Sequence, residues 1–292
     1  MRSLVSVVGL GTMGQGIAIV CASAGFETHV FDANIELAKN APAAIAAKLA
    51  RIAERSKRTP EESRAIADRI VVDASPRASC AGAEVVIEAI VESLDAKAAL
   101  FAEVASAAPA TALLASNTSG LSISELGRRS GAADRLLGLH FFNPPTAMEL
   151  VEVVVGDETS PANVERALEF VRAIGKTAVV VRDSPGFATS RLGVTLGAEA
   201  MRMVEEGVAS AADIDRAMEL GYRHPMGPLK VSDLVGLDVR LAILETLAKE
   251  LGARFEPPAI LRKLVAQGRL GKKVGLGFYR WTESGPVPEP IE

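Results

Sequence analysis

"VSVVGLGTMGQG", residues 5–16, decides how the first half of this chain is interpreted. A mostly apolar run typical of a buried strand leads directly into Gly9-x-Gly11-x-x-Gly14, and an apolar helical pattern follows the glycines. A strand, a glycine-rich turn and a helix in this order predict the opening of a βαβ unit.

The three glycines suit a dinucleotide-binding turn. They permit a tight turn, close approach of the backbone to a diphosphate, and close packing of helix on strand. A second predicted strand, "ETHVFD", ends in Asp32, about twenty residues on, where a carboxylate accepts hydrogen bonds from adenosine ribose hydroxyls. That carboxylate would repel the 2′-phosphate of NADP, and no arginine follows in "DANIE", so the pattern favours NAD. The structural alternative is a glycine turn with a solvated aspartate.

Outward from this turn, the first 180 or so residues alternate β-prone runs with longer helical patterns. This rhythm predicts an α/β fold with a Rossmann-type, mostly parallel sheet. We expect strands at Leu4–Val8, Glu27–Phe31, Ile70–Val72, Val85–Glu88, Ala112–Ala115, Leu136–Leu139, Leu150–Val155 and Thr177–Val181.

After "RDSPGF" the pattern becomes helical, with no alternating strand, and we place a domain boundary there. Residues 1–183 would form the NAD-binding domain and 184–292 a smaller all-helical domain. Ser184 would cap a helix reaching about Glu206, with Pro185 in its first turn. This helix is apolar or small on nearly every face, which predicts burial in the domain or in a subunit interface. The proline-rich tail "ESGPVPEPIE" is expected to be loosely ordered at its end.

Composition excludes several classes of protein. Of 292 residues 49% are hydrophobic, and 32 basic against 36 acidic residues give a net charge of −4 with no charged tail, which argues against nucleic-acid binding. No apolar run is long enough to span a membrane, so we expect a cytoplasmic protein. The two cysteines, Cys21 and Cys80, show no spacing typical of zinc or disulfides, and no metal site is expected.

The stretch "LLASNTSGLS" is a predicted strand that opens into Asn117, Thr118 and Ser119. In a doubly wound sheet, ligands bind beyond the carboxyl ends of the strands, so these side chains would lie over the cofactor. A loop of this composition is equally typical of a helix cap, and the pattern alone leaves both interpretations open.

His140 ends another predicted strand, "RLLGLH", and Glu152 follows twelve residues later inside the apolar run "ELVEVVV". A buried carboxylate needs a partner, and imidazole is the natural candidate. An imidazole held by a carboxylate can accept a proton near neutral pH, which suits removal of a hydroxyl proton while hydride leaves carbon for a nicotinamide. A lone histidine at a strand end is more often structural, but the upstream cofactor turn and Glu152 favour the base.

Taken together, "GLGTMGQG", "VIEAIVES", "ASNTSGLS", "GLHFFNPP", "LVEVV", "DSPGF", "HPMGPL", "DLVGLD" and "GKKVGLGFY" resemble the 3-hydroxyacyl-CoA dehydrogenases, especially the bacterial 3-hydroxybutyryl-CoA type. The resemblance covers about residues 4–281. It implies NAD-dependent, reversible oxidation of (S)-3-hydroxyacyl-CoA, and a homodimer.

The resemblance also assigns site residues. His140 would be the general base, Glu152 would orient it, and Ser119 would hydrogen-bond the substrate. The positions implied or predicted to contact NAD are Gly9, Leu10, Gly11, Thr12, Met13, Gly14, Asp32, Glu92, Lys97, Asn117, Ser119, Asn143 and Lys273.

One catalytic position departs from the family. The family usually has asparagine where "PGFATSR" has Ser190, and this asparagine is counted as catalytic. A serine hydroxyl still donates one hydrogen bond but is shorter than an amide. We expect a working enzyme with altered substrate positioning.

A CoA ester also needs a site for its phosphates. Lys48, Arg51 and Arg55 recur at i, i+3 and i+7, so they share one face of a predicted helix. The corresponding helical hairpin of the family contacts CoA. A solvated basic face is the alternative, and nearby Glu54 dilutes the charge.

Two other functions stay open on the sequence alone. One is an NAD-dependent dehydrogenase of a free hydroxy or sugar acid such as gulonate, although "HFFNPP" and "HPMGP" favour the CoA enzymes. The other is a dinucleotide-binding protein impaired by Ser190.

Overall fold

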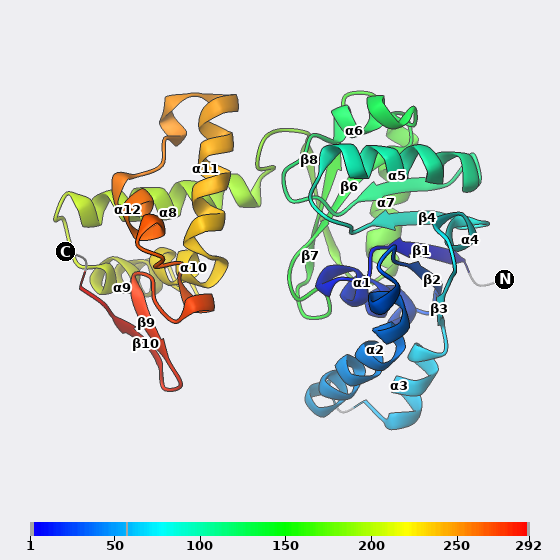
Figure 1. Cartoon of the computed structure of the whole chain (residues 1–292), viewed down its shortest axis with the longest axis horizontal. Coiled ribbons are helices and arrows are strands. Elements are labelled where there is room, and N and C mark those ends of the chain that lie inside the picture. Colours follow the sequence, from blue (N-terminus) through cyan, green and yellow to red (C-terminus); the bar gives the residue numbers. More distant parts are fainter. Residues whose placement is uncertain (1–2, 57, 291–292) are drawn as a thin grey trace. The chain divides into compact units, whose positions relative to one another are not determined.

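The structure is a computed structural model that describes residues 3–56 and 58–290 (Figure 1). The chain divides into two compact units, Met1–Ser184 and Pro185–Glu292. This division falls one residue after the boundary expected from the sequence.

The first unit is built on an eight-stranded sheet with the order β3-β2-β1-β4-β5-β6-β7-β8. Neighbouring strands are parallel except β6 and β7, which are antiparallel. The sequence therefore correctly predicted a mostly parallel Rossmann-type sheet. The strands are β1 (Leu4–Val8), β2 (Glu27–Phe31), β3 (Ile70–Val72), β4 (Val85–Glu88), β5 (Leu113–Ser116), β6 (Leu136–Phe141), β7 (Leu150–Val155) and β8 (Thr177–Arg182).

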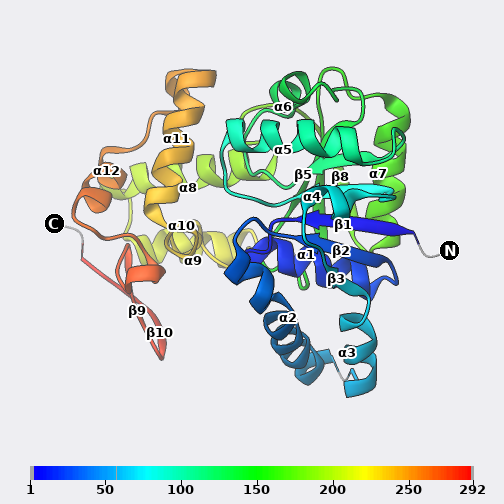
Figure 2. The same cartoon turned by 45° about the vertical axis from the view of Figure 1, so that its right-hand side comes forward.

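Helices cover both faces of this sheet. On one face α1 (Thr12–Ser23), α2 (Ile35–Ser56) and α7 (Pro161–Ala173) contribute to the main apolar cluster. Figure 2 shows α5 (Leu94–Ala107) and α6 (Ile123–Ser130) on the side opposite α1 and α2. The two remaining helices of this unit are α3 (Pro60–Ala67) and α4 (Pro76–Cys80).

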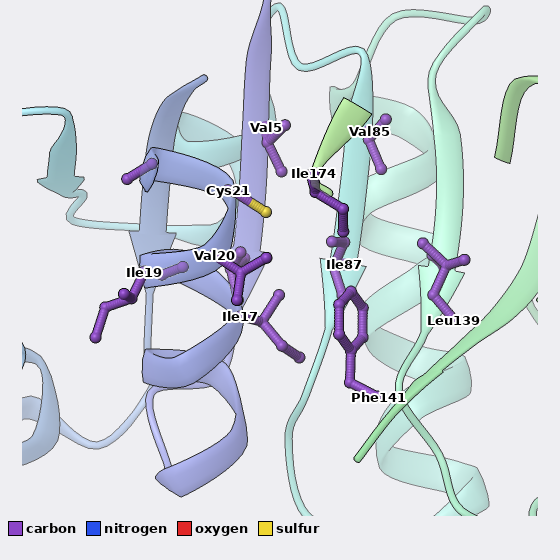
Figure 3. Close-up of a cluster of buried hydrophobic side chains, with 14 of the residues drawn as sticks. Val5, Ile17, Ile19, Val20, Cys21, Val85, Ile87, Leu139, Phe141 and Ile174 are labelled. Atoms are coloured by element: carbon purple, nitrogen blue, oxygen red, sulfur yellow. The ribbon is translucent and has the colours of Figure 1, made fainter. Parts of the chain in front are cut away.

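Figure 3 shows part of this apolar cluster, which packs α1 against the sheet. Ile17 and Val20 of α1 lie alongside Ile87 of β4 and Phe141 of β6. Fully burying such side chains contributes about 1.5–3 kcal/mol each, so the helix after the glycines is held rigidly against the sheet. Strand order reverses between β1 and β4, and a crevice beyond the carboxyl ends at such a point is the usual ligand site of an open α/β sheet.

The second unit is mainly helical, but the expectation that it contains no strand is wrong. A two-stranded antiparallel hairpin, β9 (Tyr279–Thr282) and β10 (Gly285–Pro288), ends the described chain. It is held because the hydroxyl of Tyr279 donates to Asp215 and the indole of Trp281 donates to Asp233. The helical elements are α8 (Thr189–Glu205), α9 (Ala211–Gly221), α10 (Pro228–Val235), α11 (Leu237–Leu251), η1 (Ala253–Phe255), α12 (Ala259–Ala266) and η2 (Lys272–Val274).

Part of the proline-rich segment forms β10, and the expectation of looser order concerns only the end of this segment. Residues 291–292 lie outside the described residues.

The predicted start of α8 is also wrong. Ser184 does not cap it; the helix begins at Thr189, and Ala188 at the N-cap makes no side-chain capping bond. Gly186 and Phe187 have φ values of +75° and +49°, which a right-handed helix cannot include. Within the described residues, no helix combines the length and apolarity needed to cross a membrane.

Candidate active site

The glycine turn after β1 has the geometry expected of a dinucleotide site. Gly9 has a φ of +105°, and a Cβ on Gly14 would lie only 1.7 Å from the carbonyl oxygen of Gly9. A Cβ on Gly11, in contrast, would have no atom within 4 Å. The first and third glycines are therefore required by the fold itself, whereas the second leaves open space where a diphosphate can approach the N-terminus of α1.

Asp32 lies at the end of β2 beside this turn. Its Oδ2 accepts a hydrogen bond from the backbone amide of Leu10 at 2.6 Å, and its Oδ1 accepts one from Asn34 at 2.7 Å. Each carboxylate oxygen has a second lone pair, so Asp32 can still accept ribose hydroxyls. A pocket of about 520 Å³ adjoins it, lined among others by Ala33, Val72 and Asp73. These residues fit the adenosine half of NAD.

Leu10, Thr12 and Met13 contribute less through their side chains. Leu10 is fully buried and Met13 packs against the core, so these two offer the cofactor mainly their backbone. Thr12 is exposed at the first position of α1.

The strand register brings His140 and Glu152 together. They are direct cross-strand partners on β6 and β7, and His140 Nδ1 lies 2.7 Å from Glu152 Oε2. Glu152 is fully buried, and His140 is 6% exposed. The carboxylate therefore holds the Nδ1 side of the imidazole ring in a buried site, where water screens the charges poorly. The ring of Phe142 lies against the imidazole, with centroids 4.6 Å apart.

The Asn117–Ser119 loop follows β5, next to β6 in the sheet. Asn117 Oδ1 accepts a hydrogen bond from the Phe141 amide at 2.9 Å, directly after His140. Asn117 thus ties the end of β5 to the end of β6. The exposed Ser119 donates its backbone amide to Glu92 at 3.0 Å, and its hydroxyl makes no hydrogen bond to the described residues.

Lys97 is buried between two carboxylates. It is 1% exposed, and its ammonium lies 2.5 Å from Glu88 Oε1 and 3.3 Å from Glu92 Oε2. An ammonium has three donors, so pairing with Glu88 does not exclude a further acceptor, and NAD contact by Lys97 stays a prediction. Lys97 also positions Glu92, whose Oε1 accepts hydrogen bonds from the hydroxyl of Thr118 and from the backbone amide of Ser119.

Glu88 was missed by the sequence reasoning. Its buried carboxylate accepts hydrogen bonds from Lys97, from the Ser116 hydroxyl at 2.7 Å and from the Ile90 amide at 2.7 Å, so it links the ends of β4 and β5. The signal was present, since a glutamate inside "VVIEAI" is as unusual as Glu152 inside its strand.

The other predicted residues are spread over both units. Asn143 is exposed after β6, before a cis peptide bond to Pro144. Lys273 belongs to the second unit, where its ammonium pairs with both carboxylate oxygens of Asp238 at 2.5 and 2.6 Å. Ser190 lies in the first turn of α8. NAD contact by Asn143 and Lys273 stays a prediction.

The three basic residues lie on α2 as expected. Lys48 is half-buried, its ammonium lies 3.4 Å from the carbonyl oxygen of Thr12, and burial lowers its pKa. Arg51 and Arg55 are exposed. The basic face of α2 therefore begins beside the cofactor turn at Lys48 and continues along the helix to Arg55.

Comparison with known proteins agrees with this arrangement. Residues 4–184 match the model of the 3-hydroxyacyl-CoA dehydrogenase NAD-binding domain, and residues 186–281 match that of the 3-hydroxyacyl-CoA dehydrogenase C-terminal domain. The chain belongs to the 3-hydroxyacyl-CoA dehydrogenase family.

Three relatives illustrate its place among the 3-hydroxyacyl-CoA dehydrogenases. A probable 3-hydroxybutyryl-CoA dehydrogenase of Bacillus subtilis is 41% identical and covers 96% of this chain and 97% of its own. The 3-hydroxyadipyl-CoA dehydrogenase of Escherichia coli is 40% identical over 95% of this chain and 58% of its own. The crystal structure of (S)-3-hydroxybutyryl-CoA dehydrogenase from Ralstonia eutropha is 34% identical, with a TM-score of 0.92 and coverage of 97% and 100%.

Proposed function

We propose that this member of the family catalyses the NAD-dependent, reversible oxidation of (S)-3-hydroxyacyl-CoA to 3-oxoacyl-CoA, including short chains such as 3-hydroxybutyryl-CoA. The observation that carries the proposal is the His140 and Glu152 pair on adjacent strands of a sheet that also bears the cofactor turn.

In the oxidation direction, His140 Nε2 takes the proton of the substrate hydroxyl. Glu152 fixes the ring through Nδ1 and stabilises the imidazolium that forms. The Ser119 hydroxyl holds the substrate oxygen, and Glu92 fixes the Ser119 backbone. Bound NAD supplies the hydride acceptor. In the reverse direction His140 returns the proton to the 3-oxo group.

The test is whether the protein consumes NADH when acetoacetyl-CoA is added. We expect consumption by the unmodified protein and a loss of about a hundredfold or more in His140→Ala, with NADH binding retained. Free acetoacetate serves as the control substrate, because a free-acid dehydrogenase would prefer it. Unchanged turnover in His140→Ala would refute the assignment.

We also propose that Lys48, Arg51 and Arg55 attract the phosphates of CoA. Reversing the charge of Arg51 and Arg55 together should raise the Michaelis constant for acetoacetyl-CoA but not for a phosphate-free acetoacetyl thioester. Arg172→Glu on α7 is the control for net charge. Equal Michaelis constants for CoA substrate in the variant and the parent would remove this subsite.

Finally, we propose a homodimer formed through the second unit. Supporting this, several large apolar side chains of the unit are exposed, including Leu192, Leu196, Leu220 and Tyr222. Light scattering after size-exclusion chromatography should give a molar mass twice that of the chain. The Leu192→Asp variant should have the molar mass of a monomer. A monomeric parent protein would contradict this proposal.

A further inference from the structure

Arg240, on α11, is a buried cation with no hydrogen-bond or ion-pair partner among the described residues. It is 6% exposed, and its Nε makes no hydrogen bond among residues 3–56 and 58–290. Burial lowers its pKa to about 10, and no nearby carboxylate offsets that effect. Two lysines of the unit, in contrast, are paired: Lys230 with Glu219 at 2.8 Å, and Lys273 with Asp238.

The guanidinium lies against the beginning of α8. Its Nη1 is 3.4 Å from the point where a Cβ on Gly193 would stand, so the absence of a side chain at Gly193 leaves room for it. Ser190 precedes Gly193 by one helical turn on the same side of α8. The Ser190 hydroxyl makes no hydrogen bond to the described residues, so two unpaired donors belong to one end of this helix.

The charge around this end of α8 is positive. Arg191, next to Ser190, lies over the ring of Phe255 at 5.3 Å and forms no ion pair within the described part of the chain. Backbone amides at a helix N-terminus add to the positive potential. A buried, uncompensated cation in such a field is costly by itself and favours an anion supplied from outside the unit.

We propose that Arg240 and Ser190 form an anion site that binds a carboxylate carried on the acyl chain of the substrate, making this a dehydrogenase that favours 3-hydroxydicarboxylyl-CoA esters. The inference rests on the proposed function and on the sequence resemblance, which implies that Ser190 occupies a catalytic position of the family. It deepens that function by naming a substrate class, and short unsubstituted esters remain substrates.

A carboxylate fits better than a phosphate. One guanidinium is neutralised by one negative charge and presents a planar pair of donors that matches a carboxylate. A phosphate that carries nearly two negative charges would leave about one of them uncompensated in a buried place. The 3-hydroxyadipyl-CoA dehydrogenase among the relatives is named for an acyl group with such a terminal carboxylate.

The experiment compares kcat/KM for 3-oxoadipyl-CoA and 3-oxohexanoyl-CoA, which have the same chain length and differ in the terminal carboxylate. We expect the parent protein to favour the adipyl ester by about tenfold or more, as a hydrogen bond between charged groups provides. In Arg240→Met the ratio should fall to near one, and Arg240→Lys should restore part of it. Lys249→Met, an exposed lysine of the same helix, should keep the parental ratio.

A second measurement does not depend on turnover or on the folding of one variant. Adipate should raise the melting temperature of the parent protein and of Lys249→Met, but not that of Arg240→Met. Repeating the two-ester comparison with pantetheine thioesters separates the sources of the anion. If the ratio survives without CoA phosphates, it comes from the acyl carboxylate. If Arg240→Met instead lowers kcat/KM equally for both CoA esters and leaves the pantetheine esters unaffected, the site binds a phosphate and the proposal is overturned.

A parental ratio near one also overturns the proposal, whatever the variants do. If only the hexanoyl ester is reduced, this inference fails and the proposed function stands. If neither ester nor acetoacetyl-CoA is reduced, the proposed function fails.

Discussion

Replacing Glu152 by glutamine removes a buried negative charge 2.7 Å from His140 Nδ1 while keeping the side-chain length and an acceptor oxygen. Once His140 holds the substrate proton, the imidazolium and the carboxylate attract by about 4 kcal/mol, for a separation of about 4 Å and an effective dielectric constant of about 20. Each 1.4 kcal/mol or so is a factor of about ten in rate. Losing this attraction in full would therefore lower the rate by about a thousandfold. If the imidazole carries only part of the charge in the transition state, the rate should fall by about a hundredfold.

The assay is steady-state kcat for oxidation of 3-hydroxybutyryl-CoA by NAD, with NADH binding measured in parallel. Glutamine should lower kcat and leave the affinity for NADH unchanged, because Glu152 contacts the base and not the cofactor turn. Glu149→Gln, an exposed carboxylate just before β7, is the matched control for the loss of charge. A folded Glu152→Gln variant with parental kcat would refute the reasoning.

Three further predictions concern the cofactor site and the thiols. Gly14→Ala should lower the melting temperature because its Cβ meets the Gly9 carbonyl, whereas Gly11→Ala should keep the melting temperature and weaken NADH binding; equal effects in both assays would contradict this division. Asp32→Ala should weaken the binding of NAD by about tenfold or more. It should also lower the ratio of kcat/KM with NAD to kcat/KM with NADP, and an unchanged ratio would exclude the ribose contact. Burial raises the pKa of Cys21 to about 12 and that of Cys80 above its usual value, so thiolate is scarce; a thiol reagent should label neither in native protein and both after unfolding.

Features decided by local pattern were predictable from the sequence. The strands flanking the glycine turn were found at their observed bounds because apolar runs, glycines and polar strand ends are all local signals. The partnership of His140 and Glu152 was also accessible, since a carboxylate inside an apolar strand must be paired and a histidine lay one hairpin away.

Features that depend on distant residues or unusual backbone were not predictable. The start of α8 was misplaced because a positive φ at Phe187 has no signature in the residue type. The pairing of Lys97 with Glu88 was not predicted, because Glu88 lies on another element. The strand at Tyr279 was missed because it is anchored by Asp215 and Asp233, many residues away.

The His140 and Glu152 pair has an evolutionary consequence, since it is set by strand pairing and not by a loop. Residues 142–149 connect the two strands, and insertions there would leave the pairing intact. One residue inserted within β7 before Glu152 would turn the following side chains to the other face and put a valine opposite the imidazole. Insertions in this lineage should therefore be found in residues 146–149, after the shared "HFFNPP" motif, with the spacing inside each strand held constant.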